Sequence, residues 1–567
     1  MKEIMEFSPQ TRSANIEVLR SEMFDVVVVG GGITGAGVAR EAALRGLRVA
    51  LVEKNDFASG TSGKSARMVH GGLRYLEHYQ FGLVLSACAE RYRVFRMAPR
   101  LVRPTPFTYP VYRNSRNSLL KMRLGMILYD LLARFRNFQA HRILMPNEVA
   151  SVEPALRQEG LVGAAHYYDC IEDDARLTLT TILAAARSGT TIASYVEVIG
   201  VIRNGSQVAG LRGRDSLSGK EFDVHARVVV NATGVWMDQI IQLDDPNSPT
   251  VIRANRGIHL VFPWEKLPVT GAVAFTSSDG RRALYALRWR DTTIVGTTDV
   301  DHNGSLDEVY ATAPEVLPML EATNHAFAPR RLTVADILST YAGVRPLISE
   351  EGKTAYQVSR DHQIFESPSG LVSISGGKLT TFRKMAEDVM DHVAVKLAKE
   401  HAISAQRKIR SDKVPLTEPG FDAESTVKQW SRRHGDMPDD VLAHLAASYG
   451  RGGEKILDFI SGDPVMGTRI VSRLPYVYGE IPYAVQYEMN LTLSDFLIRR
   501  THILYEAPDQ GVGCAQRVSE ILSEHLAWTA DEKTRQIDAF YREVELTRRY
   551  IREIEVVEAP LAQTAAP

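Results

Sequence analysis

The stretch Gly30-Gly31-Gly32-Ile33-Thr34-Gly35 constrains the fold of this chain more than any other feature. It has the spacing G-x-G-x-x-G, it follows the apolar run 24–29, and small apolar residues at helical spacing come after it. In such a strand–turn–helix unit the glycines permit the turn, admit a pyrophosphate to the backbone and let helix pack on strand. The stretch therefore predicts a βαβ unit that binds a dinucleotide at the start of its helix.

Glu53 marks the expected ribose end of this dinucleotide site. It ends a second apolar strand, residues 47–53, about 20 residues after the glycines, where a carboxylate accepts hydrogen bonds from both ribose hydroxyls. The carboxylate disfavours NADP, because it would repel the additional phosphate. The motif alone leaves the choice between NAD and FAD open.

Bulk composition excludes several other classes of protein. The 67 Lys and Arg residues balance 68 Asp and Glu, so no overall charge favours nucleic acid as a partner. The three cysteines, Cys88, Cys170 and Cys514, form no C-x-x-C pair, which argues against a disulfide framework or a metal site and favours a reducing compartment. There is no apolar run of about 18 residues or more, and residues 1–22 lack the apolar region of a secretory signal.

The order of patterns along the chain predicts more than one domain. Two further apolar strands, 228–230 and 371–374, end in turns with glycine, so we expect one sheet built from distant segments. The alternating stretches 283–289 and 292–296 predict an antiparallel hairpin in a second sheet. Polar residues gather in 401–420 and helical patterns follow, which places a boundary there.

Motifs downstream of the glycines carry a family resemblance. They occur in one consistent order at residues 59–77, 167–177, 231–236, 296–299, 341–347 and 376–381. On these motifs the chain, over roughly residues 23–550, resembles the aerobic FAD-dependent glycerol-3-phosphate dehydrogenases, within the amino-acid-oxidase-like flavoproteins. The resemblance implies that the dinucleotide is FAD.

The resemblance also implies a multidomain fold of the α/β and α+β classes. A Rossmann-type FAD-binding domain is interleaved with an antiparallel-sheet substrate domain, and a C-terminal helical domain follows, in which Arg499-Arg500-Thr501 resembles a recurring feature. The expected ranges are 23–110, 165–250 and 335–400 for the FAD-binding domain, 111–164 and 251–334 for the substrate domain, 411–558 for the helical domain, and 1–22 and 559–567 for flexible termini.

The implied activity is oxidation of sn-glycerol 3-phosphate to dihydroxyacetone phosphate, with hydride transfer to flavin N5 and electrons passed to membrane quinone. We expect a cytoplasmic enzyme held peripherally on the inner face of the cell membrane, and a homodimer is left open. Three alternatives remain: a dehydrogenase of another polyol phosphate such as erythritol phosphate, an oxidase that reduces oxygen, and a non-catalytic flavin-bound sensor. Related oxidases carry an insertion between the segments that match Arg345 and Lys378, which lie close together here.

Oxidation of a secondary alcohol needs a base for the hydroxyl proton. His70 is the expected base or proton relay, because imidazole titrates near neutral pH and the glycines after it allow close approach to a ligand. A simple turn histidine is the alternative for His70. His259, in Gly257-Ile258-His259-Leu260, is the second candidate base.

Cations are needed to hold the phosphate and to stabilise reduced flavin. Arg74 and Arg345 are expected to bind the phosphate through forked hydrogen bonds, and Arg360 lies where the family places a further cation. Lys378 follows two glycines at a strand end, where it is expected to stabilise negative charge on the flavin or the substrate. Tyr75 is expected to bind a substrate oxygen, with packing in a half-buried core as the alternative.

The expected FAD contacts combine the dinucleotide turn with the motif segments. They are Gly30, Gly32, Ile33, Thr34, Gly35, Glu53, Lys54, Thr61, Ser62, Ser65, Arg67, Met68, Val69, Val196, Gly234, Gly376, Lys378, Leu379 and Thr380. Gly63-Lys64 and Ala66-Arg67 depart from the run of small residues and serines that the family usually has, which puts the contacts of this segment in doubt.

Residues 119–138 read LLKMRLGMILYDLLARFRNF, an apolar helical pattern with Lys and Arg near both ends. A basic amphipathic helix of this kind lies in a membrane interface. The alternative is a core helix of the substrate domain with solvated arginines at its ends.

Overall fold

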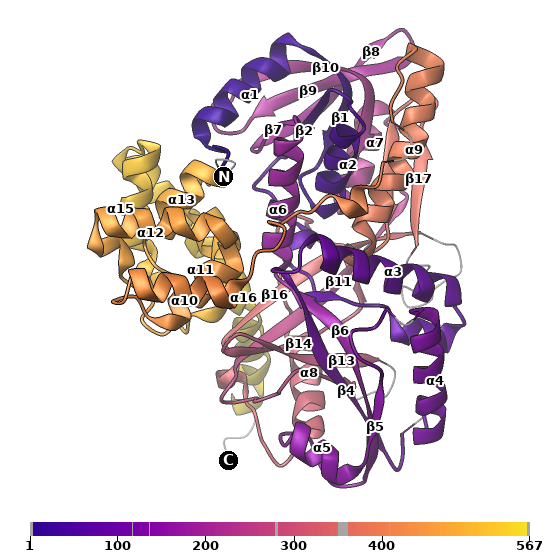
Figure 1. Cartoon of the computed structure of the whole chain (residues 1–567), viewed down its shortest axis with the longest axis vertical. Helices are drawn as coiled ribbons and strands as arrows, with labels where there is room; N and C mark the ends of the chain where they lie inside the picture. The colour runs from indigo at the N-terminus through magenta and orange to yellow at the C-terminus, as the bar shows by residue number, and fades with distance from the viewer. Residues whose placement is uncertain are drawn as a thin grey trace.

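The computed structural model describes residues 4–115, 117–134, 136–277, 282–349, 361–406 and 409–563, with side chains except at 74, 78 and 557–563. Two sheets lie one above the other, and a group of helices from the C-terminal part of the chain stands beside them (Figure 1). The expected combination of a Rossmann-type sheet, an antiparallel sheet and a helical domain is therefore confirmed.

Among the described residues, eight strands form the first sheet, in the order β17-β18-β10-β1-β2-β7 with β9 and β8 attached to β10. The strands are β1 (Met23–Val29), β2 (Val49–Val52), β7 (Thr191–Ala193), β8 (Val196–Asn204), β9 (Gln207–Asp215), β10 (Glu221–Asn231), β17 (His362–Glu366) and β18 (Val372–Gly376). β1 pairs in parallel with β2 and β10, and β10 pairs in parallel with β18. The predicted sheet from distant segments is confirmed.

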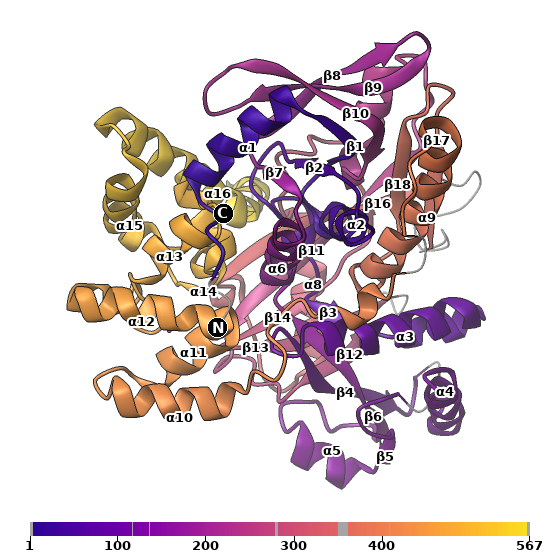
Figure 2. The same cartoon turned by 45° about the horizontal axis from the view of Figure 1, so that its top comes forward.

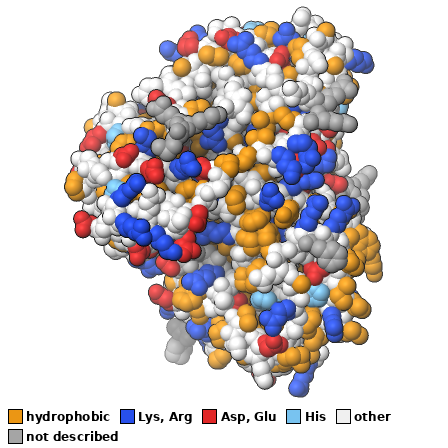
Figure 3. Space-filling model, viewed as in Figure 1, with side chains coloured by type: hydrophobic (Ala, Val, Ile, Leu, Met, Phe, Trp, Pro, Cys, Tyr) orange, Lys and Arg blue, Asp and Glu red, His pale blue; other side chains and the backbone are white. Residues whose placement is uncertain are grey.

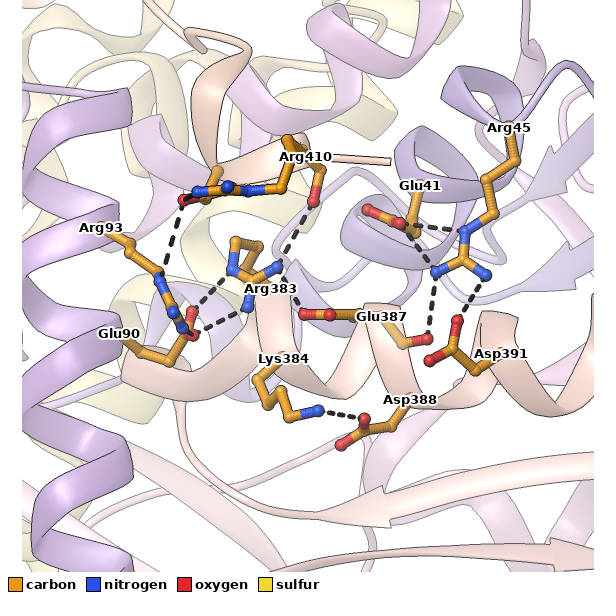
Figure 4. A network of polar contacts seen from close by, with 12 residues as sticks. Glu41, Arg45, Glu90, Arg93, Arg383, Lys384, Glu387, Asp388, Asp391 and Arg410 are labelled. Atoms are coloured by element: carbon orange, nitrogen blue, oxygen red, sulfur yellow. Dashed lines mark hydrogen bonds and ion pairs between the residues drawn. The ribbon is translucent and has the colours of Figure 1, made fainter. Parts of the chain in front are cut away.

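Helices cover both faces of this sheet because its central strands are apolar on both sides. α2 (Ile33–Leu44), α6 (Asp174–Arg187) and α9 (Phe382–His401) pack on one face, and α1 (Pro9–Ser21) and α7 (Met237–Asp244) pack on the other. Figure 4 shows ion pairs that tie α2 to α9, and α9 to α3 (Phe81–Met97); in one of them the buried Arg45 lies between the buried Glu41 and the half-exposed Asp391.

The N-terminal segment differs from the flexible terminus expected from the sequence. Residues 9–21 form α1, in which Leu19 is buried in the core under the sheet. The guanidinium of Arg12 donates to Ser194 O at 2.8 Å and to the Asp215 carboxylate at 2.5 Å. These contacts are with residues far along the chain, so the local composition gave no sign of them.

In the described part of the chain, ten strands form the second sheet, in the order β15-β11-β14-β13-β12-β4-β6-β3, with β16 on β11 and β5 on β6. They are β3 (Met68–Val69), β4 (Val102–Tyr112), β5 (Arg142–Leu144), β6 (Leu161–Glu172), β11 (Ile252–Pro263), β12 (Ala272–Thr276), β13 (Ala283–Trp289), β14 (Thr292–Gly296), β15 (Val300–Asp301) and β16 (Ser339–Ile348). The predicted hairpin is confirmed as β13 and β14. α4 (Leu119–Leu132), α5 (Pro146–Val152) and α8 (Ala313–Ala326) accompany this sheet.

The C-terminal part is helical, as predicted. It contains α10 (Ala423–Arg433), α11 (Asp439–Tyr449), α12 (Gly453–Gly462), α13 (Glu480–Tyr487), a π-helical turn at Asp495–Arg500, α14 (Ile503–Glu506), α15 (Val512–Leu526) and α16 (Ala530–Gln563). Figures 1 and 2 both show these helices beside α6. Among the described helices, none combines the length and the apolar character needed to cross a bilayer.

Candidate active site

A cavity of about 480 Å³ extends from the carboxyl ends of β1 and β2 to the face of the second sheet. The expected residues that line it are His70, Tyr75, His259, Arg345 and Lys378, together with Gly30, Gly32, Ile33, Thr34, Glu53, Lys54, Thr61, Ser62, Ser65, Met68, Val196, Gly234, Gly376, Leu379 and Thr380. Ligands of parallel sheets bind at the carboxyl ends of the strands, so the position of the cavity suits a dinucleotide.

Three expected cofactor contacts lie outside the lining of this cavity. Gly35 packs against the turn, Val69 is fully buried in a hydrophobic cluster, and the Arg67 guanidinium stacks over the Trp289 ring at 4.4 Å. Arg67 has a φ of 52°, so the backbone at this residue is in the left-handed region. Arg360 and the side chain of Arg74 fall outside the described residues.

The dinucleotide turn has the close packing that its glycines predict. A Cβ on Gly35 would lie 1.9 Å from Gly30 O, and one on Gly30 would lie 2.7 Å from Ala232 O. α2 has no side-chain cap at Gly32, and the N–H of Ile33 donates to Ser62 Oγ at 2.9 Å. Gly32, Ile33 and Thr34 line the cavity, so the start of α2, where N–H groups lack intrahelical partners, faces it, as a diphosphate requires.

Glu53 lies where the ribose is expected. Its carboxylate accepts from Gly31 N at 2.6 Å and from Asn55 N at 2.8 Å, which leaves further lone pairs for ribose hydroxyls. Burial raises the pKa of Glu53, and the two backbone N–H donors oppose that rise. Together, the turn, the helix start and this carboxylate fit the adenosine diphosphate part of FAD.

His70, Tyr75 and Lys378 meet on the far side of the cavity. β18 leads into Gly376 and Gly377, both with positive φ, and the following Lys378 places Nζ 3.7 Å from the centre of the Tyr75 ring. The backbone N–H of His70 donates to Thr380 Oγ1 at 3.2 Å, which joins the His70 turn to the segment after β18. The ammonium of Lys378 and the imidazole of His70 therefore line one cavity, next to the glycines that precede Lys378.

Arg345 of β16 and His259 of β11 come from neighbouring antiparallel strands. The Arg345 guanidinium donates to Asn255 Oδ1 and to Thr297 Oγ1, both at 2.9 Å, which fixes its plane. A Cβ on Gly257 would lie 2.3 Å from this guanidinium and 2.4 Å from Thr297 Oγ1, so a side chain at residue 257 would force these groups to shift.

His259 is 3% exposed and stacks on the Tyr341 ring, with centroids 4.5 Å apart. Neither of its ring nitrogens has a hydrogen-bond partner among the described residues. Burial, then the charges of Arg345 and Arg67, lower the pKa of His259 to about 3. The imidazole is therefore neutral at physiological pH, and it is one of the residues that line the cavity.

Several lining residues were not expected from the sequence. Asp299 lines the cavity at the end of the 296–299 motif, and Phe107, Tyr167 and Tyr285 line it from three strands of the second sheet. The alternating pattern of β4 and β6 predicts which residues share a face with Phe107 and Tyr167. It does not show that this face lines the cavity. In the described ranges, no group of three His, Cys, Asp or Glu side chains is placed to hold a metal ion.

Comparison with known proteins gives the cofactor. A family model described as FAD dependent oxidoreductase matches residues 25–383, and one described as the C-terminal domain of alpha-glycerophosphate oxidase matches residues 409–533. Because the first model covers most of the chain and the cavity has the geometry of a dinucleotide site, this protein is an FAD-dependent oxidoreductase.

Named relatives identify the family within the FAD-dependent oxidoreductases. The glycerol-3-phosphate dehydrogenase of Mycobacterium leprae is 36% identical, covering 99% of this chain and 94% of its own, and that of Synechocystis is 34% identical, covering 94% and 98%. The solved glycerol-3-phosphate dehydrogenase of Bacillus halodurans, complexed with FAD, has 29% identity and a TM-score of 0.79, covering 95% of this chain and 98% of that one. The chain belongs to the FAD-dependent glycerol-3-phosphate dehydrogenase family.

Proposed function

We propose that this enzyme oxidises sn-glycerol 3-phosphate to dihydroxyacetone phosphate. The observation that carries the proposal is that His259, Arg345 and Lys378 line one cavity, which brings a proton acceptor and two cations together. The names of the full-length relatives support the same substrate. The turn at residues 30–35 and Glu53 would hold FAD, and FAD bound there would supply the hydride acceptor for this oxidation.

In this proposal His259 takes the hydroxyl proton, and His70 remains the alternative that its motif suggests. A histidine with a pKa of about 3 is a weak base, but the substrate phosphate is a dianion, and its charge beside Arg345 favours the protonated imidazole. Substrate binding therefore raises the pKa of His259 at the step that needs a base. Arg345 and Lys378 hold the phosphate and the negative charge that develops.

The competing activities differ in substrate and acceptor, so one set of assays separates them. Purified holoenzyme is given glycerol 3-phosphate or erythritol 4-phosphate, with an artificial acceptor and with air alone. We expect turnover with glycerol 3-phosphate and the acceptor, and little peroxide in air. Negligible turnover with glycerol 3-phosphate contradicts the proposed substrate, stoichiometric peroxide indicates an oxidase, and a flavin that neither substrate bleaches anaerobically indicates a sensor.

We further propose that the enzyme sits on the cytoplasmic face of the membrane and passes its electrons to quinone. α4 exposes an apolar row, Leu120, Leu124, Ile127 and Leu131, of which the first two are 69% and 60% exposed. Its opposite side, with Met122, Met126 and Tyr129, is buried against the second sheet. Figure 3 shows apolar side chains along the edge of the molecule where α4 lies.

Water is a poor environment for such a row, whereas a bilayer interface accepts it, with Lys121 and Arg123 beside it to meet anionic lipid. The test is sedimentation with vesicles that contain anionic lipid. The double variant Leu120→Asp, Leu124→Asp should stay in the supernatant, and Leu317→Asp, which changes an isolated exposed leucine of α8, should sediment like the parent. Equal sedimentation of the double variant and the parent would contradict the interface. The homodimer stays a prediction.

A further inference from the structure

One short segment of the helical domain contacts both ends of a loop that lines the cavity. The loop is residues 57–66. It supplies Thr61, Ser62 and Ser65 to the cavity wall, and Glu53, which also lines the cavity, lies just before it in the sequence. The segment is residues 499–502, which close the π-helical turn and lead into α14.

At the first end, Asp56 is fully buried and meets two guanidinium groups. Arg500 forms a forked pair with it, Nη1 to Oδ2 at 2.8 Å and Nη2 to Oδ1 at 3.0 Å, and Arg499 Nε donates to Oδ2 at 2.5 Å. Burial alone would raise the pKa of Asp56, but Arg500 and Arg499 lower it overall, so the carboxylate is ionised. A buried carboxylate of this kind is stable only while its cations stay in place.

Asp56 is joined directly to the dinucleotide turn. The next residue, Phe57, packs so closely on Gly31 that a Cβ there would lie 2.8 Å from its ring. Glu53, the expected ribose ligand, is three residues before Asp56 and accepts from the same Gly31. A shift of Asp56 would therefore move both the ribose end of the site and the packing of the turn.

At the second end, Arg67 donates through Nη2 to His502 Nδ1 at 3.4 Å. His502 in turn donates through Nε2 to Asp173 at 2.8 Å, so its ring lies between Arg67, which directly follows the loop, and the N-cap residue of α6. Arg67 holds a left-handed backbone conformation that only an over-determined setting maintains. Its link to His502 is one part of that setting, and its stacking on Trp289 is another.

We infer that the helical domain forms part of the FAD site: residues 499–502 hold Asp56 and Arg67 and thereby fix the loop 57–66 against the cofactor. They are positioning residues, since they act through the loop and do not line the cavity. The inference depends on FAD as the cofactor and not on the identity of the substrate. It assigns a role to the Arg499-Arg500-Thr501 motif, which the activity alone leaves without one.

The test measures FAD release from the holoenzyme, followed by the rise of flavin fluorescence after dilution, with circular dichroism recorded in parallel. Asp56→Asn removes the charge but keeps the volume, and we expect FAD release at least about tenfold faster while the dichroism is unchanged. Glu480→Gln is the control, because Glu480 is an equally buried carboxylate of the helical domain, bonded to His444 and Tyr449, that does not contact the loop.

Release within twofold of the parent in folded Asp56→Asn, or equally fast release from Glu480→Gln, overturns the inference. A milder pair of variants tests the second end, and it decides the matter if Asp56→Asn is recovered only as unfolded protein. His502→Asn keeps an acceptor near the position of Nδ1 toward Arg67, and His502→Gln keeps only the contact with Asp173. We expect faster release from His502→Gln than from His502→Asn, and equal release from the two overturns the inference for this end.

Discussion

The two ends of the cavity are built in different ways. At the dinucleotide end, backbone groups and glycines form most of the site. They come from one continuous stretch, Gly30 to Gly35, and Glu53 follows about 20 residues later. At the substrate end, side chains form the site, and they come from four separate segments of the chain: His70, His259, Arg345 and Lys378. The first end depends on local geometry and the second on how two sheets are assembled.

This contrast predicts different consequences of substitution. A change at the dinucleotide end should remove FAD and every activity with it, whereas a change at the substrate end should leave a yellow protein with altered kinetics. The four substitutions that follow test this division, in order of expected effect.

Gly35→Val should have the largest effect. Its Cβ would lie 1.9 Å from Gly30 O, a backbone atom that cannot move without opening the turn. Overpacking of this kind costs about 1–3 kcal/mol or more, and here the cost falls on the pyrophosphate site itself. We expect protein purified without flavin absorbance. Gly125→Ala, in a helix with open space around the new methyl group, is the control and should retain FAD. A Gly35→Val enzyme that retains FAD and activity would contradict the proposed division between the two ends of the cavity.

His259→Gln should lower kcat by about 10²–10⁴-fold, as expected for loss of a general base, while FAD stays bound. His70→Gln is the matched variant, because both histidines line the cavity and only one is proposed to take the proton. Steady-state kinetics with saturating acceptor measure both. If His70→Gln shows the larger fall in kcat and His259→Gln is nearly normal, the two roles are reversed.

The features that the sequence predicts by itself follow the same division between the two ends of the cavity. The turn, the strands around it and the sheet from distant segments were predicted correctly, because short-range periodicity and glycine spacing determine them. The substrate end depended on the family resemblance, because no local pattern shows that His259 and Arg345 lie on paired strands. The contact of the Arg67 side chain with Trp289 has no signal in the sequence, and the expected contact of the Arg67 backbone with FAD stays a prediction.

The packing of the chain ends was also beyond local patterns. The sequence of α1 resembles a polar terminal segment. In the structure, however, Arg12 forms an ion pair with Asp215, about 200 residues away in β9, which pairs with β10. In the sequence, Arg499-Arg500 stands out only by its resemblance to a recurring family feature. Nothing in the sequence marks Asp56, three residues after Glu53, as the partner of these two arginines. Long-range ion pairs of this kind become visible only when the fold is known.

Arg345→Lys should weaken substrate binding by about 1–3 kcal/mol, seen as a higher KM, with FAD retained. The charge remains, but a single ammonium cannot reproduce the forked donor that Asn255 and Thr297 hold in place. Flavin content and KM are measured on the same preparation. An unchanged KM would remove Arg345 from the phosphate site and leave Lys378 as the principal cation.

Tyr75→Phe should have the smallest effect and decides how Tyr75 acts. The ring lies 3.7 Å below the Lys378 ammonium, and phenylalanine preserves this cation–π contact while removing the hydroxyl. If the ring only supports Lys378, KM should stay within about threefold of the parent, whereas Tyr75→Leu, which loses the aromatic face, should raise KM by about tenfold. If Tyr75→Phe instead raises KM as much as Tyr75→Leu, the phenol itself binds substrate. In that case the substrate end contains a neutral hydrogen-bond donor in addition to its cations.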